Sequence, residues 1–348
     1  MYKLRIRHFT DACFRNRGLV FLFLGFMMIP VNQITAQDLR FSQFYANRLY
    51  LNPGLAGSEE CPFIMVQYRN QWPGFDGAFV SYSASYDEYN DFLQGGIGFM
   101  AVSDDLAGGA INSTSFHGQY AYHFRASQSV LVQTGLEFAR VQRKVDPSGL
   151  IFPHMINRVT GEIIQTGEAL SAKTTGFFDF SAGAIAYFSD YFIGFAVHHL
   201  TAPDQSFNES EPSIMERKYT IHAGTAVPLS TGRPVRGLIR LGEVKFSPNV
   251  LYQQQGSSKQ VNLGLYMSYQ WLEAGLWLNQ NLAFDYQSYI ILAGYVHPSF
   301  RLAYSFDMYM GFSSSIFPGS GAHEISMSIP LPCRTETPRV RAVRCPAF

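Results

Sequence analysis

The feature of this sequence that most limits its fold is a repeated alternation of apolar and polar residues. Between residues 300 and 309, apolar side chains such as Leu302, Tyr304 and Met308 alternate with smaller or polar ones such as Ser305 and Asp307. A β-strand has a side-chain period of two, whereas an α-helix, with a period of 3.6, would mix the two series. The segment is therefore predicted to be a strand with one apolar and one polar face.

The same alternation returns along the chain from Phe63 onward, in segments of about 8 to 14 residues separated by turn residues. The predicted strands are 63–71, 78–87, 95–104, 112–124, 129–144, 174–188, 191–201, 218–228, 244–254, 259–270, 272–280, 288–296, 299–310 and 323–331. The ninth, 244–254, has the weakest pattern. The even count of fourteen suits a single-chain bacterial barrel, because it returns both ends of the barrel to the same side of the membrane.

The first 36 residues have the pattern of a secretory signal. Basic side chains precede an apolar run from Gly18 to Ile29, and small residues close the segment at Ala36. A run of about 12 residues is shorter than the roughly 20 that a spanning helix needs, so residues 1–36 are expected to be removed. No later segment approaches that length, so a membrane-embedded chain would have to be a closed barrel, which satisfies every backbone donor and acceptor.

Composition separates this barrel from a soluble β-sandwich, whose strands would also alternate. The chain is 47% hydrophobic, 15% aromatic and only 15% charged, which suits a surface that faces lipid. Aromatic residues gather near predicted strand ends, as Tyr120, Tyr122 and Phe124 do, and this is typical of membrane girdles. The prediction is an all-β, transmembrane, antiparallel up-and-down barrel of about 14 strands in the outer membrane of a Gram-negative bacterium.

Charge argues against a nucleic-acid partner. Without residues 1–36 the chain keeps 21 basic and 25 acidic side chains, so no basic surface is expected.

The predicted links give an independent check on the barrel. Very short links at 125–128, 189–190, 271 and 297–298 contrast with long ones at 145–173, 202–217, 281–287 and 311–322. Periplasmic turns on one rim and extracellular loops on the other would produce this contrast, although the link around Pro73 is short for an outer loop.

Three cysteines remain after the expected cleavage, Cys61, Cys333 and Cys345. An odd number cannot be fully paired within one chain. A Cys333–Cys345 bridge in the basic tail, residues 332–348, is one possibility in an oxidising compartment, and the unbridged tail is the other.

Two blocks stand near the start of the expected mature chain: Phe41-Ser42-Gln43-Phe44-Tyr45 with the run from Tyr50 to Gly57, and then Gln67-Tyr68-Arg69-Asn70-Gln71-Trp72-Pro73. Together they resemble the opening of the PorP/SprF family of type IX secretion outer-membrane proteins. Later segments also resemble the family, namely 96–99 with Asp104-Asp105 and Gly108, and Ala322-His323-Glu324-Ile325-Ser326. The resemblance covers roughly residues 37–331, so the tail looks like an extension.

This resemblance implies a role in the type IX secretion and gliding machinery of Bacteroidetes-type bacteria. Family members sit in the outer membrane, associate with periplasmic components, and support export or surface attachment of secreted proteins such as adhesins. The implied partners are therefore periplasmic and outer-membrane components of that machinery, a secreted client protein, and outer-membrane lipid.

The segment 37–62 is expected to lie on the periplasmic side, either in or against the barrel mouth as a plug or partner surface, or merely as a lead into the first strand. Asn52-Pro53-Gly54 is a turn signal. The candidate partner contacts are Phe41, Phe44, Tyr45, Asn52, Pro53, Tyr68, Arg69 and Trp72. Trp72 is also explained as an interface anchor, because indole rings favour the headgroup level.

Six charged residues are predicted to face the lumen: Glu137, Asp179, Glu273, Arg301, Asp307 and Glu324. Their mixed signs favour a structural network over a selectivity ring.

His198 and His199 are adjacent on a predicted strand and so are expected to face opposite sides, which disfavours a shared metal. No Cys-x-x-Cys, His-Glu-x-x-His, Walker loop or Gly-x-Ser-x-Gly occurs. No catalytic residue, metal or cofactor is therefore assigned, and an enzyme is not expected.

Two functions remain open. The first is a non-enzymatic component that anchors or scaffolds a secretion assembly, with loop 145–173 as the largest candidate surface for a client. The second is a passive porin or hydrophobic-solute channel. A barrel of about fourteen strands lies between small barrels filled by side chains and the open porins of 16 to 18 strands, so strand count alone does not decide whether the lumen is plugged.

Overall fold

A computed structural model describes residues 38–59, 61–75, 77–147, 155–157, 160, 171–208, 212–229, 244–282, 286–310 and 321–333. The proposed signal, most of loop 145–173 and most of the tail lie outside these residues. Two short helices, α2 (Arg48–Leu51) and η1 (Pro53–Leu55), precede the strands. Within the described residues, no helix has both the length and the apolar character needed to cross a bilayer.

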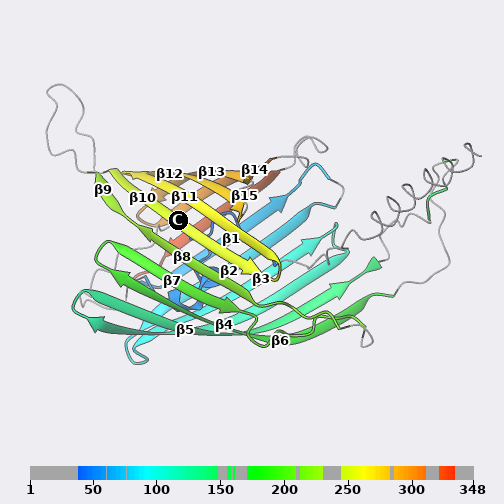
Figure 1. Ribbon diagram of the computed structural model, residues 1–348, viewed down its shortest axis with the longest axis horizontal. Helices are drawn as coiled ribbons and strands as arrows, with labels where there is room; N and C mark the ends of the chain where they lie inside the picture. Colours follow the sequence, from blue (N-terminus) through cyan, green and yellow to red (C-terminus); the bar gives the residue numbers. More distant parts are fainter. Residues whose placement is uncertain are drawn as a thin grey trace, which may run out of the picture. The chain divides into compact units, whose positions relative to one another are not determined.

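Antiparallel strands make up almost all the rest of the described chain (Figure 1). They are β1 (Phe63–Gln71), β2 (Phe79–Asn90), β3 (Gly95–Leu106), β4 (Ile111–Ser127), β5 (Val130–Val145), β6 (Lys173–Phe188), β7 (Tyr191–His198), β8 (Lys218–Thr225), β9 (Val227–Leu229), β10 (Val244–Gln255), β11 (Ser258–Tyr269), β12 (Leu272–Asn281), β13 (Tyr286–His297), β14 (Phe300–Tyr309) and β15 (Gly321–Pro330).

The sheet closes on itself. Except for β8 and β9, each strand pairs with its neighbour in sequence, and β1 pairs with β15 from Phe63 opposite Pro330 to Gln71 opposite Ala322. β8 and β9 form a single position in the ring, because both pair with β10 in one continuous register, with Asn249 opposite Gly224 and Phe246 opposite Val227. The barrel therefore has fourteen strand positions, as the alternation predicts, and the weakest prediction, 244–254, corresponds to β10.

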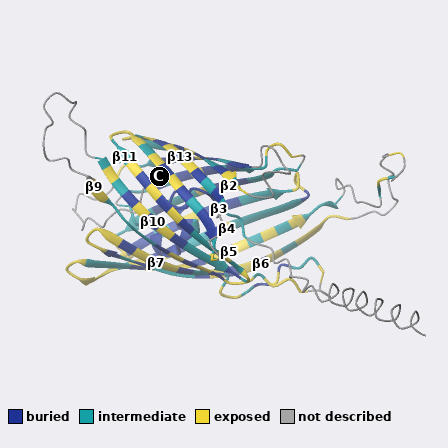
Figure 2. Ribbon diagram, turned by 45° about the horizontal axis from the view of Figure 1, so that its top comes forward, coloured by how far each residue is buried: buried dark blue, intermediate teal, exposed yellow. Residues whose placement is uncertain are grey.

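The two faces of the wall differ in exposure, because buried and exposed residues alternate along the strands (Figure 2). In β14, Leu302, Tyr304 and Met308 point outward and remain exposed, whereas Ser305 and Asp307 point into the lumen and are buried. The outer face carries a belt of exposed apolar side chains on every side of the ring, including Val66, Tyr82, Phe116, Leu136, Phe180, Ile193, Leu263, Leu276, Ile291 and Ile325. Water cannot favour such a belt, whereas hydrocarbon does.

The rims also differ. The rim that holds Phe63 and Pro330, here called the short-turn rim, has links of two residues at 128–129, 189–190, 270–271 and 298–299. The opposite, long-loop rim carries the links 146–172, 199–217 and 310–320, but also short ones at 107–110 and 256–257. The link 230–243 lies between β9 and β10 on the short-turn rim, so long and short links alternate less strictly than the sequence suggests.

Candidate functional site

The lumen is occupied by the chain's own N-terminal residues, 38–58, here called the strap. Asp38 contacts Lys218 and Gln255, which lie where β8 begins and β10 ends on the long-loop rim. At the other end, the backbone N–H of Gly57 donates to Asp87 near the short-turn rim, at 3.0 Å. The strap therefore extends along the whole lumen. The sequence had suggested a position only in or against its periplasmic mouth.

A disulfide joins the chain beyond the strap to the end of the barrel. Cys61, just before β1, is bonded to Cys333, just after β15, with their Cα atoms 4.6 Å apart. Cys333 is thus bonded to Cys61, and the Cys333–Cys345 alternative is wrong. The bond was not foreseen because the two cysteines become neighbours only when β1 and β15 close the ring.

Three of the sequence blocks that carry the resemblance meet in one buried network. Glu324 of β15 accepts the backbone N–H of Ser42 at 2.7 Å and that of Gln43 at 2.9 Å. Gln67 and Arg69 of β1 donate to the same carboxylate, Arg69 at 3.1 Å. The side chain of Gln43 adds bonds to Ser305 and to the Glu324 carbonyl, so the strap is bound to the wall through both main-chain and side-chain groups.

Arg69 joins two carboxylates of the wall. Its guanidinium lies 3.1 Å from Glu324 and 3.1 Å from Asp307 of β14, and its side chain is 3% exposed. It also donates to Ser42 in the strap. A cation buried between two carboxylates is stable only while all its partners stay in place, so this group forms a structural lock between the strap and the β14–β15–β1 wall.

Asn52 is the centre of a second docking point. Its side-chain oxygen accepts the N–H of Gly54 at 2.9 Å, and its amide donates to the Ala184 carbonyl at 3.1 Å and the Phe195 carbonyl at 3.3 Å. The Nε2 of His222 lies 3.1 Å from the same amide. The Asn-Pro-Gly turn thus binds the wall of β6 and β7 through backbone carbonyls, which explains the choice of an amide that both donates and accepts.

Where the strap lies against the wall, the wall carries glycines that face inward. A Cβ on Gly135 would lie 2.3 Å from the carbonyl oxygen of Pro53, and a Cβ on Gly96 would lie 2.0 Å from that of Ala56. Real Cβ atoms do not approach so closely, so these glycines let the strap backbone lie directly on the sheet.

We expect Gly183→Ala to destabilise the docked strap by about 1–3 kcal/mol, the cost of inserting a methyl group into a packed site. Its Cβ would lie 2.0 Å from the side-chain oxygen of Asn52. Gly118→Ala is a matched control, because nothing lies within 4 Å of the added atom. Unfolding of the detergent-solubilised barrel, followed by its heat-dependent gel mobility, would compare them. Equal midpoints would contradict tight docking at Gly183.

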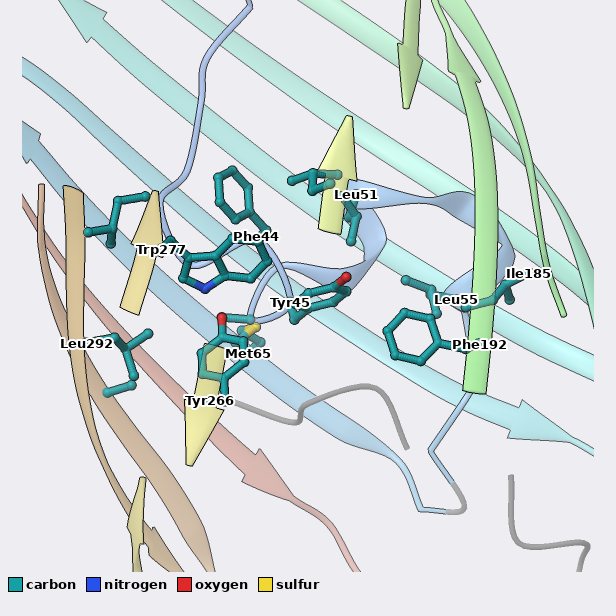
Figure 3. Packing of buried hydrophobic residues seen from close by; sticks show 14 of the residues in the cluster. Phe44, Tyr45, Leu51, Leu55, Met65, Ile185, Phe192, Tyr266, Trp277 and Leu292 are labelled. Carbon is teal, nitrogen blue, oxygen red and sulfur yellow. The ribbon is translucent and has the colours of Figure 1, made fainter. Parts of the chain in front are cut away.

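Aromatic packing fills the middle of the lumen (Figure 3). The ring of Phe44 lies 5.2 Å from that of Trp277 on β12, edge to face. Tyr45 packs between Trp277 at 6.0 Å and Phe192 of β7 at 5.9 Å. Because Phe192 and Trp277 come from different parts of the ring, the strap provides the apolar core that joins them.

A charged cluster holds the strap at the long-loop rim. Asp38 lies 2.7 Å from His199, whose other ring nitrogen lies 2.6 Å from Asp179 of β6. Lys218 is 3.4 Å from Asp38. Burial lowers the pKa of His199, but the carboxylates of Asp38 and Asp179 raise it more, to about 10. The ring is therefore cationic at neutral pH, and Asp38, His199, Asp179 and Lys218 form what is here called the outer latch.

The expectation that His198 and His199 face opposite sides is wrong. β7 ends at His198, and His199 has a φ of 58°, in the left-handed region. This turn of the backbone brings both rings to the lumen, where His198 pairs with the Leu51 carbonyl at 3.3 Å. Within the described part of the chain, no group of three His, Cys, Asp or Glu side chains is placed to hold a metal ion.

Little space remains beside the outer part of the strap. A cavity of about 50 Å³ lies between Arg40, Tyr50 and the ends of β8, β10 and β11. A buried water needs about 10–15 Å³ of cavity volume, so this cavity has room for only a few waters. The side chain of Arg40 crosses it to Gln260 and Asn262 on β11.

The structure buries most of the candidate partner contacts inside the chain. Phe41, Phe44, Tyr45, Asn52, Pro53 and Arg69 are buried, whereas Tyr68 and Trp72 keep part of their surface on the outer wall and the long-loop rim. Tyr68 packs on Tyr82, and Trp72 on Phe79 and Tyr309. Partner contact by the buried six stays a prediction, and it would require the strap to leave the lumen.

All six lumen-facing candidates lie on inward positions. Glu137, Asp179, Asp307 and Glu324 are buried, and Glu273 and Arg301 are half-buried. Glu137 accepts hydrogen bonds from Gln119 and Ser181. They do not form one group: Glu324 and Asp307 bind Arg69, and Asp179 belongs to the outer latch. Sequence reasoning gave no site role to Asp38, His199 or the wall glycines, although Gly135 and Gly183 stand in the polar, inward series of their strands.

Among known proteins, a family model described as type IX secretion system membrane protein PorP/SprF matches residues 34–329. No curated protein matches. In fold the chain is similar to Omp33 of Acinetobacter baumannii (7% identity, 78% of this chain and 98% of that one, TM-score 0.41). It is also similar to the toluene transporter TodX of P. putida (8%, 80% and 92%, 0.42) and to a FadL homologue of Pseudomonas aeruginosa (13%, 80% and 92%, 0.39).

Proposed function

The chain belongs to the PorP/SprF family of type IX secretion system membrane proteins, and from this we propose that it is a non-enzymatic, sealed outer-membrane scaffold of that machinery. It supports export or surface anchoring of secreted proteins such as adhesins, as part of a secretion and gliding apparatus. The passive porin is the alternative.

The observation that supports a scaffold over a channel is the strap. The closed barrel is an outer-membrane protein with an apolar outer belt, but its lumen holds the chain's own residues 38–58. Three separate locks bind the strap: Glu324 with Arg69, Asn52 on its glycine wall, and the outer latch. A solute channel would have to break these contacts, whereas a scaffold benefits from a rigid, filled core.

The two rims would then contact different partners. Short turns face the periplasm and longer loops face outward in barrels of this kind. The short-turn rim, with Phe63, Pro330 and the Cys61–Cys333 bond, would meet periplasmic components of the machinery. The long-loop rim would meet the secreted client, and most of its largest link, 146–172, lies outside the described residues.

Deletion of the gene would separate the two functions. We expect cells without this chain to lose one or more secreted proteins from their surface while uptake of small solutes is unchanged. Labelling of surface proteins followed by mass spectrometry measures the first quantity, and uptake of a radiolabelled sugar or a monoaromatic compound measures the second. Complementation with the wild-type gene is the control. Normal surface proteins with reduced uptake would overturn the scaffold and favour the porin.

A further inference from the structure

The strap has a direction that the family assignment does not imply. Its first described residue, Asp38, touches His199, just after the long-loop end of β7, and Lys218 and Gln255, at the long-loop ends of β8 and β10. Its last residues reach Asp87, near the end of β2 at the short-turn rim. The order along the chain is therefore long-loop rim, lumen, short-turn rim and then β1.

The part of the chain around Asp38 is held, not merely adjacent. The Asp38 backbone N–H donates to Gln255 at 3.1 Å, while its carboxylate binds Gln255, His199 and Lys218. The neighbouring stretch after β7 also folds inward. Gln205 is buried against Arg143 of β5, and Asp204 forms an isolated antiparallel backbone β-bridge with Ile214. Backbone and side chains together fix where the chain enters the barrel.

We propose that the N-terminal end of the strap lies at the outer mouth of the barrel: the chain runs from Asp38 at the cell surface through the lumen toward the periplasm, and the outer latch retains its outer end. The N-terminal end of the strap is then part of the surface that a client on the outer face meets. This inference rests on the proposed function only for which rim faces outward, and the geometry of the strap does not depend on it.

Three cysteine probes test the proposal, each in a Cys345→Ser background so that Cys61 and Cys333 remain paired. The first probe is a short Gly-Ser-Cys-Gly insertion directly before Asp38. The second, Ser257→Cys, lies in the exposed β10–β11 turn of the long-loop rim, and the third, Ser129→Cys, lies in the exposed β4–β5 turn of the short-turn rim. Each is treated on intact cells, and again after permeabilisation, with a maleimide that does not cross membranes.

We expect the insertion and Ser257→Cys to react on intact cells and Ser129→Cys to react only after permeabilisation. If Ser257→Cys labels on intact cells but the insertion does not, the N-terminal end of the strap does not lie at the cell surface. The inference then falls, while the proposed function stands. If Ser129→Cys labels on intact cells and Ser257→Cys does not, the orientation is reversed, and both this inference and the outer client surface fall.

The latch is tested in the same cells by His199→Gln, which removes the cation between Asp38 and Asp179. Losing a charged hydrogen bond should raise the rate of protease cleavage near Asp38 by about tenfold or more, with the barrel's heat-dependent gel mobility retained. His297→Gln, at the exposed end of β13 on the opposite rim, is the matched control. Equal cleavage rates for the two variants would show that the latch does not retain the strap.

Discussion

Replacing Arg69 by alanine should destabilise the folded barrel by about 3–5 kcal/mol, the largest single-residue effect expected in this protein. The substitution leaves the carboxylates of Asp307 and Glu324 buried without the cation that lies 3.1 Å from each. It also removes a donor to Ser42 in the strap. Unfolding by denaturant in detergent, followed by tryptophan fluorescence, measures the loss, because Trp277 lies in the core that the strap completes.

Two further variants define the cause. Arg69→Lys keeps a charge but has no planar fork to bind two carboxylates together, so its stability should fall between wild type and alanine. Arg125→Ala, at an exposed position near the short-turn rim, should change stability by no more than about 0.5 kcal/mol. A small loss for Arg69→Ala, equal to that of Arg125→Ala, would contradict the proposed lock.

Removal of residues 38–57 should convert a sealed barrel into a conducting one. The wall contacts of β1 to β15 run through backbone pairs and do not require the strap, but the aromatic core and the locks lose one side. In planar lipid bilayers we expect steady conductance from the deletion variant and none from the intact chain. Steady conductance from the intact chain would contradict a sealed lumen.

A second variant keeps this test decisive where the deletion fails to fold. Gly183→Ala retains the whole strap but disturbs its contact with Asn52, so it should give brief openings rather than steady current. Gly118→Ala, on the open outer side of β4, should remain silent. Silence from all three would mean that the wall collapses inward or that other residues fill the lumen.

The strands could be predicted from the sequence because one physical cause, lipid outside and polar contacts inside, acts on every strand. Predicted and observed boundaries agree within three residues along the chain. The largest errors lie at rims, where that cause stops acting. The predicted strand 191–201 ends three residues early, at His198, because His199 adopts a left-handed backbone that alternation does not signal.

The strap could not be placed in the same way. Its residues contact wall positions more than a hundred residues away, such as Gln43 with Glu324 and Asn52 with Ala184, and no local period encodes such pairs. The resemblance marked the blocks as a set without saying that they touch. The inward glycines were visible in the alternation, but a glycine reports close approach of a backbone without naming which one.

The enclosed strap also fixes an order of events during biogenesis. Phe44 and Tyr45 of the strap pack between wall strands from different parts of the ring, and at the β1–β15 seam Arg69 and Glu324 bind the strap as well as each other. We therefore expect the sheet to close around residues 38–58, with the β1–β15 pairing forming last and Cys61 meeting Cys333 only then. Whatever inserts this protein into the membrane therefore handles an open, curling sheet with its N-terminal residues already in its concave side.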